Sequence, residues 1–128
     1  MTTNYIELHD HLEKQITNLG NELSGPMSGF ARLHRKAVED GVLTGKTKEL
    51  IALAISVAIR CEGCISYHVH DAIQAGATRP EIIEVIGVAI LMGGAPAAVY
   101  ATYAMDAVEQ FSEAQKNQRI NSLILMCK

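Results

Sequence analysis

Two cysteines and a histidine stand at helical spacing in the segment CEGCISYH. Cys61, Cys64 and His68 take relative positions 0, 3 and 7, and at about 100° per residue they fall within roughly a 60° arc of one helix face. Cysteines three residues apart in a first helical turn are close enough to form a disulfide without large backbone movement. Because the chain holds only three cysteines, such a pair indicates redox or metal chemistry rather than a structural disulfide framework.

Either cysteine of this pair could be the one that reacts first. If Cys61 lies at the helix start, the free backbone N–H groups there favour its thiolate; Arg60 acts in the same direction and Glu62 opposes it. His68 stands four residues after Cys64, so its imidazole can take the thiol proton directly or through one water. The residues alone leave both orders of attack open.

A single carboxylate precedes this segment on the preceding predicted helix. Glu49 stands twelve residues before Cys61, at the edge of the uncharged run LIALAISVAI. Burying a carboxylate alone is costly, and orienting and charging His68 would explain its place. Equally, Glu49 can be solvated near the helix start, where negative charge is favourable. Both interpretations remain open at this point.

The full pattern resembles a known family. Glu49, Cys61-x-x-Cys64 and His68, followed by AIQAGATRPEI and a Gly-Gly-x-Pro-Ala-Ala break, are similar to the alkylhydroperoxidase D-like branch of the carboxymuconolactone decarboxylase family over roughly residues 30–107. The resemblance implies an all-helical fold that assembles as a trimer or hexamer. It also implies a cysteine pair that reduces hydroperoxides and is re-reduced by an external dithiol protein. Cys64 would then attack the peroxide, Cys61 would resolve, and Glu49 and His68 would form a proton relay.

One position departs from that family pattern. Well-known members of the branch carry a histidine directly before the second cysteine, where this chain has Gly63. General thiol–disulfide exchange without peroxidase activity is therefore an alternative. The decarboxylase branch lacks the cysteine pair, so lactone decarboxylation is not expected. A second alternative is a zinc-binding or non-catalytic oligomeric protein, because Cys61, Cys64 and His68 could supply three ligands and Glu49 or a distant histidine a fourth.

Apolar periodicity and capping signals predict about six helices and no strand. The first carries Tyr5 to Leu19 on one apolar face and ends at Gly20. The stretch NELSGPMSG is predicted to be a loop, and the uncharged run from 50 to 59 to be buried on nearly all sides. Thr78-Arg79-Pro80-Glu81 is a capping box that opens a further helix. The later predicted helices are 30–41, 48–60, 61–75, 79–92 and one from 96 to at least 115.

Length and charge limit the classes of function. A chain of 128 residues suits one domain, 1–128. Eleven basic against fourteen acidic residues, with no basic run, argue against a nucleic-acid partner. The 21-residue uncharged segment 85–105 has the length of a membrane span. Gly93, Gly94 and Pro96 would break it, so we expect a buried helical pair, partly closed by a sister subunit, and no membrane partner. No signal peptide is evident, and a cytoplasmic location is expected.

The remaining candidate ligands are interpreted as surface groups. His70 should lie on the helix face opposite the cysteines, while His9, His11 and His34 fall on polar helix faces. Cys127, next to the C-terminus, is interpreted as a spare thiol. We therefore expect neither a bound metal nor a cofactor.

Overall fold

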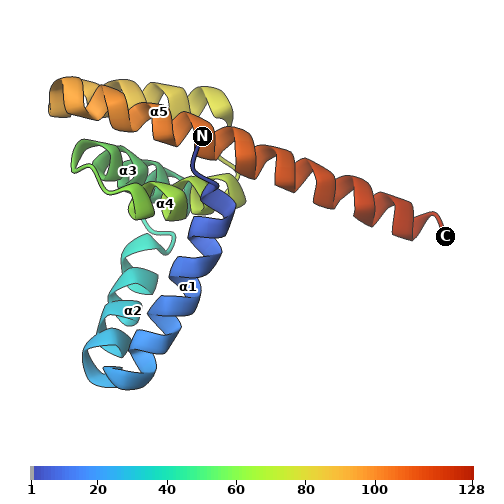
Figure 1. Ribbon diagram of the computed structural model, residues 1–128, viewed down its shortest axis with the longest axis horizontal. Coiled ribbons are helices and arrows are strands. Elements are labelled where there is room, and N and C mark those ends of the chain that lie inside the picture. Colours follow the sequence, from blue (N-terminus) through green and yellow to red (C-terminus); the bar gives the residue numbers. More distant parts are fainter. Residues whose placement is uncertain (1) are drawn as a thin grey trace.

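The computed structural model describes residues 2–128, and every regular element in that range is a helix (Figure 1). This confirms the all-α prediction. The five helices are α1 (Tyr5–Glu22), α2 (Ser24–Val38), α3 (Gly45–Ala58), α4 (Glu62–Gln74) and α5 (Arg79–Met126).

The hydrophobic core lies where α3, α4 and α5 pack on one another. Helices α3 and α4 contribute fully buried branched side chains, and the second half of α5 contributes a row of alanines at helical spacing. Small side chains let neighbouring helices approach closely, so α4 is packed against both α3 and α5, which also pack on each other. Buried members of this core include Leu53, Val57, Ile65, Val69, Ala97, Ala101, Ala104 and Ala107.

Helices α1 and α2 form a tight hairpin where the sequence predicted a loop, and that prediction was wrong. Helix α1 continues through Gly20, and only Leu23 separates it from α2. Pro26 lies in the first turn of α2, where its missing N–H has no intrahelical partner to lose. A Cβ on Gly20 would lie 4.0 Å from the Cβ of Met27, so the two helices pass close together there.

Helix α5 begins and breaks where the sequence predicted. The Thr78 and Glu81 side chains form the reciprocal capping box at its start. Gly94 has non-helical backbone angles (φ 70°, ψ −155°), and the chain reverses direction there (Figure 1). Arg79 Nε accordingly lies 3.4 Å from Glu109 Oε1 on the returning half. This break splits α5 into two helical segments, which accounts for the predicted sixth helix.

The long apolar helix also bears on the membrane prediction. By length and composition alone, α5 is the one helix within residues 2–128 that is long and apolar enough to cross a membrane. The reversal at Gly94 divides its uncharged stretch between two shorter segments. A Cβ on Gly93 would lie only 2.6 Å from the Ala97 Cβ, so the close turn depends on glycine there.

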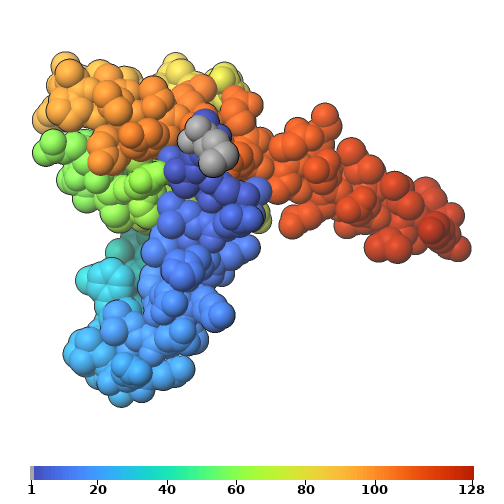
Figure 2. All heavy atoms as spheres, in the orientation of Figure 1, coloured from blue at the N-terminus to red at the C-terminus, as the bar shows by residue number. Residues whose placement is uncertain are grey.

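Two arms project from the central body (Figure 2). One is the α1–α2 hairpin, and the other is the C-terminal part of α5, which stays helical to Met126 and includes the apolar tail. Both arms expose large apolar side chains, among them Ile16, Leu19, Phe30, Leu33, Leu123 and Leu125.

The predicted burial of α3 on nearly all sides was wrong for one face. Ile51, Ile55 and Ile59 recur every fourth residue and are exposed. Helices α4 and α5 cover the rest of α3 but leave this stripe open. The stripe is therefore available to another protein surface.

Candidate redox site

Cys61 lies in the turn between α3 and α4, where it takes part both in the end of α3 and in the start of α4. Arg60 N–H donates to the Val57 carbonyl at 3.2 Å and Cys61 N–H to the Ser56 carbonyl at 3.0 Å, the two bonds of a Schellman motif that closes α3. Arg60 supplies the left-handed residue (φ 62°), a place usually taken by glycine; the equivalent position after α4 is Gly76 (φ 93°). Cys61 is also the N-cap of α4.

The two cysteines of the motif form a disulfide in the first turn of α4. Cys61 and Cys64 are bonded through their sulfurs, with their Cα atoms 5.2 Å apart. The backbone N–H of Cys64 donates to Cys61 Sγ at 3.2 Å. In the reduced protein the same N–H and the start of the helix would favour a thiolate on Cys61.

Glu49 and His68 meet across α3 and α4. His68 Nδ1 lies 2.8 Å from Glu49 Oε2, and Glu49 is 6% exposed, so the carboxylate is buried against the imidazole rather than solvated. This contact decides between the two interpretations of Glu49. With Nδ1 paired to the carboxylate, Nε2 has no hydrogen-bond partner within residues 2–128, and on a helix the His68 side chain leans toward the turn that carries Cys64.

Two further residues of this cluster were missed by sequence reasoning. The His34 ring on α2 lies 6.4 Å from the His68 ring, edge to face. Side-chain ligand atoms of His34, Glu49 and Asp71 lie within 4.8 Å of one another. His34 is exposed, as expected, yet it borders the buried carboxylate. Its position depends on how α2 packs against α1 and meets α3, and no local sequence pattern encodes that.

The residues between the cysteines contact α1. A Cβ on Gly63 would lie 3.0 Å from Leu12 Cδ1. The neighbouring Glu62 accepts a hydrogen bond at 3.0 Å from the hydroxyl of Tyr5, which is buried. Burial, and next the hydrogen bond to Glu62, raise the pKa of Tyr5, so its hydroxyl stays a donor. Helix α1 therefore covers the segment that carries the disulfide.

The interpretation of the other histidines as surface groups holds for one of them and fails for another. His11 is exposed, whereas His9 is buried on α1 and packs against the half-buried His70. Apolar periodicity placed His9 on a polar face because it could not reveal that α4 covers that face. Cys127 is free and exposed, as expected.

Comparison with known proteins shows which family the chain resembles. Residues 26–107 match the model of the carboxymuconolactone decarboxylase family. An uncharacterized protein of Cupriavidus necator is 36% identical over 105 residues, which are 82% of this chain and 93% of that protein. A protein of Paracoccus denitrificans, uncharacterized protein 4 in the cox locus, is 35% identical over 85 residues, covering 66% of this chain and 77% of its own.

Solved structures agree with the fold and the family. The apo form of a carboxymuconolactone decarboxylase family protein from Legionella pneumophila is 40% identical, with a TM-score of 0.81 over 84% of this chain and 96% of that one. A family member from Thermotoga maritima, for which a role in antioxidative response has been suggested, is 30% identical, with a TM-score of 0.71 over 81% and 95% of the two chains.

Proposed function

The chain belongs to the carboxymuconolactone decarboxylase family, and we propose that it is a thiol-dependent peroxidase that reduces hydroperoxides with the Cys61–Cys64 pair. The alkylhydroperoxidase D-like branch is consistent with this membership. The observation that carries the proposal is the buried Glu49 carboxylate, 2.8 Å from His68, which itself lies one turn beyond Cys64. A suggested antioxidative role for the Thermotoga maritima relative points the same way.

Cys64 attacks the peroxide in the proposed reaction. His68 takes the Cys64 thiol proton, and the thiolate attacks one peroxide oxygen so that the O–O bond breaks. The alkoxide leaves as an alcohol after receiving the proton from His68, and Cys64 becomes a sulfenic acid. Glu49 holds the imidazole and stabilises it while it carries the extra proton.

Cys61 then resolves the sulfenic acid. Its thiol attacks the Cys64 sulfur, the disulfide forms, and the sulfenic oxygen leaves as water. An external dithiol protein next attacks the Cys64 sulfur and releases Cys61. The Cys64 N–H, 3.2 Å from Cys61 Sγ, stabilises Cys61 as the leaving thiolate. A second thiolate of the partner completes the exchange, so the partner leaves oxidised and the pair is reduced.

Assembly and location belong to the same proposal. We place the protein in the cytoplasm, where dithiol reductants keep such pairs reduced. The exposed stripe of Ile51, Ile55 and Ile59 supports a homo-oligomer, a trimer or hexamer, whose subunits cover it. Neither nucleic acid nor a membrane is proposed as a partner.

Disulfide exchange without peroxidase activity is the competing function. The observation that favours it is Gly63, because this chain lacks the histidine that related proteins carry between the cysteines and Leu12 occupies the space beside it. A zinc site on the reduced cysteines and His68 is the third candidate. Because Glu49 is hydrogen-bonded to His68 Nδ1, a fourth ligand would have to come from another residue or from water.

Peptide-mapped intact mass tests the proposal directly. Fully reduced, metal-free protein is given one equivalent of an organic hydroperoxide. We expect loss of two hydrogens within seconds, localised to a Cys61–Cys64 bridge. With Cys61→Ser, a dimedone-trapped sulfenic acid should appear on Cys64; with Cys64→Ser, Cys61 should not be trapped at a comparable rate. Oxygens scattered over methionines and Cys127 would contradict peroxidase activity, and rapid oxidation by a protein disulfide alone would favour the competing function.

A further inference from the structure

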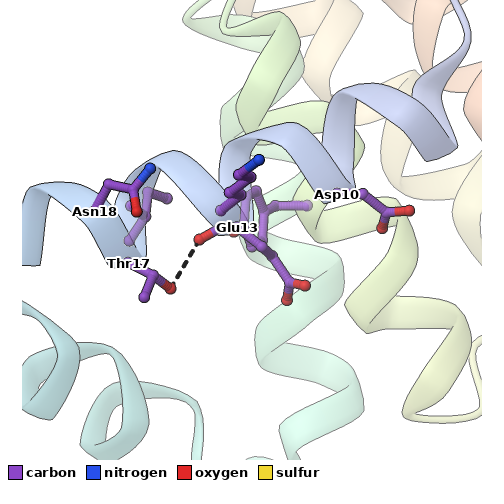
Figure 3. Close-up of a pocket in the computed structure, with 7 residues that line it drawn as sticks. Asp10, Glu13, Thr17 and Asn18 are labelled. Carbon is purple, nitrogen blue, oxygen red and sulfur yellow. Dashed lines mark hydrogen bonds between the residues drawn. The ribbon is translucent and has the colours of Figure 1, made fainter.

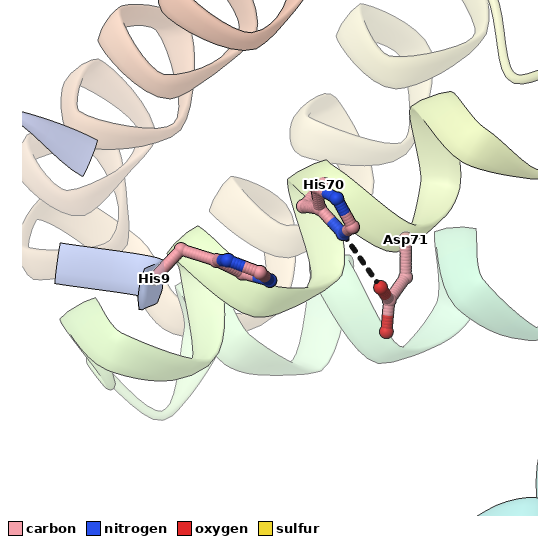
Figure 4. Close-up of side chains that lie close together, drawn as sticks. All are labelled: His9, His70 and Asp71. Carbon is pink, nitrogen blue, oxygen red and sulfur yellow. Dashed lines mark hydrogen bonds and ion pairs between the residues drawn. The ribbon is translucent and has the colours of Figure 1, made fainter. Parts of the chain in front are cut away.

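Two His-Asp dipeptides, one on α1 and one on α4, meet away from the cysteine pair. They are His9-Asp10 and His70-Asp71. The two imidazole rings lie 4.2 Å apart between centroids and are tilted by 34°, and Figure 4 shows the His9 ring directed toward His70. His9 is 5% exposed. The two rings are therefore close enough to be ligands of one ion.

The hydrogen bonds of both histidines leave the same ring nitrogen free. His9 Nδ1 lies 3.2 Å from Asp10 Oδ1, and His70 Nδ1 lies 2.9 Å from Asp71 Oδ1 (Figure 4). In the tautomer protonated at Nδ1, the carboxylate accepts that proton in each case and Nε2 keeps its lone pair. Metal-binding histidines are held in this way, with the second ring nitrogen donating to a carboxylate.

A third donor stands one helical turn beyond His9. Glu13 Oε1 lies 3.9 Å from His9 Nε2. Ligand atoms of His9, Asp10 and Glu13 fall within 4.8 Å of one another, and so do those of His9, His70 and Asp71. Ligands of a tetrahedral Zn²⁺ lie about 3.3 Å apart. His9 belongs to both groups, so rotation of the His70 and Glu13 side chains toward it would bring the two imidazoles and the Glu13 carboxylate around one ion.

The four side chains line a cavity that is open to solvent on one side. His9, His70, Asp10 and Glu13 line one cavity of about 320 Å³, and the Phe111 ring packs edge-on against both imidazoles. Asp10 and Glu13 also border a more open depression of about 650 Å³ on α1 (Figure 3). The carboxylates thus face solvent on the side from which a cation would arrive.

We propose that His9 and His70, through Nε2, and Glu13, through its carboxylate, bind a divalent transition-metal ion such as Zn²⁺. Asp10 and Asp71 hold the two rings in the required orientation. Two imidazoles and one carboxylate suit Zn²⁺ and its neighbours rather than Mg²⁺ or Ca²⁺. The ion ties α1 to α4. The site shares no ligand with the cysteine pair or His68, so it does not depend on peroxidase activity.

Zinc titration of the oxidised protein tests the site without interference from thiols. The protein carries Cys127→Ser and an intact Cys61–Cys64 disulfide, and heat of binding is measured at neutral pH. We expect one Zn²⁺ per chain. His70→Gln and Glu13→Gln should each weaken binding by at least about tenfold, while His11→Gln, an exposed histidine on α1, should bind as the parent does.

Several results would overturn the site. Absence of saturable binding at millimolar Zn²⁺ would do so. It would also be overturned if the His70→Gln and Glu13→Gln proteins bound Zn²⁺ as tightly as the parent. Because His9 is buried, His9→Gln could unfold the chain, so the test depends on the half-buried His70 and the exposed Glu13. Circular dichroism verifies that each variant is folded. Titration with Co²⁺ gives an independent readout, since its visible absorption reports nitrogen and oxygen ligands directly.

Discussion

Leu12 on α1 lies over Gly63 in the first turn of α4, so close that a Cβ on Gly63 would come within 3.0 Å of Leu12 Cδ1. Helix α1 therefore limits the room for a side chain between the two cysteines, and the proton relay that we propose uses His68 and Glu49.

Replacing Gly63 should therefore have an effect that depends on Leu12. Alanine is favoured over glycine in a helix by about 1 kcal/mol, but in the parent protein the contact with Leu12 offsets that gain. We expect Gly63→Ala to be close to neutral in the parent and to stabilise a Leu12→Ala protein by about 1 kcal/mol. Urea unfolding of the four proteins measures the coupling, and equal effects in both backgrounds would show that the contact is unimportant.

The Glu49–His68 pair gives a kinetic prediction. His68→Gln removes the base that we propose for Cys64, and we expect oxidation of the reduced pair by a hydroperoxide to slow by about 10²- to 10⁴-fold. Glu49→Gln should also slow it, and the double variant should be little slower than His68→Gln, because the two residues act as one unit. Single-turnover intact-mass kinetics measure these rates, with His11→Gln as the control. An unchanged rate in His68→Gln would falsify the relay.

Arg60 offers a test of how the disulfide turn is built. A non-glycine residue with φ 62° is held in a region that costs about 1 kcal/mol or more. Arg60→Gly should therefore raise the free energy of unfolding by about 1 kcal/mol. Arg60→Gln removes the charge but keeps the strain, and it should leave stability almost unchanged. If both variants behave alike in urea unfolding, the charge rather than the backbone governs this turn.

Local signals in the sequence predicted the parts of the fold that local chemistry controls. The Thr78–Glu81 capping box, the break at Gly94 and the cysteine turn all depend on residues within a few positions of one another. The position of Glu49 was harder to predict, because the sequence alone does not show whether its carboxylate is buried. The sequence offered pairing with His68 as one of two explanations for its place.

What the sequence could not predict depends on packing between distant segments. The segment before Phe30 that was predicted to be a loop is helical because α1 and α2 pack against each other. Glycine and proline indicate only the local preference of the chain, which such packing can override. The burial of His9 depends on α4, which begins more than fifty residues later. The exposed stripe on α3 resembles a core sequence because apolar periodicity does not show which faces of a helix the rest of the chain covers.

Tyr5 anchors α1 beside the disulfide, and its hydroxyl can be tested separately from its ring. The hydroxyl donates to Glu62 at 3.0 Å, while the ring is buried. A hydrogen bond to a charged acceptor contributes about 1.5–3 kcal/mol, so Tyr5→Phe should lower the free energy of unfolding by about that amount. Tyr67→Phe is the matched control, because its hydroxyl forms no hydrogen bond within residues 2–128. Equal losses in the two variants would contradict an anchoring role.

Glu81 ties the start of α5 to α3 and should make the stability of the protein sensitive to acid. Its carboxylate accepts hydrogen bonds from the Thr78 N–H at 2.9 Å and from the Thr78 hydroxyl at 3.0 Å. Lys46 Nζ lies 3.0 Å from its other oxygen. The bond from the Thr78 backbone, followed by those from Lys46 and the Thr78 hydroxyl, lowers the pKa of Glu81 from 4.5 to about 2.

Because the folded pKa is below the unfolded one, the ionised carboxylate stabilises the fold. This stabilisation is complete above pH 4.5 and is lost as the pH falls toward about 2. The difference in unfolding free energy between the parent and Glu81→Gln should therefore be largest near neutral pH and shrink across that window. Glu84→Gln, an exposed carboxylate on the same helix, controls for the loss of one negative charge. Urea unfolding at a series of pH values measures the difference, and a difference that stays constant down to pH 2 would mean that the capping carboxylate does not link this helix to pH.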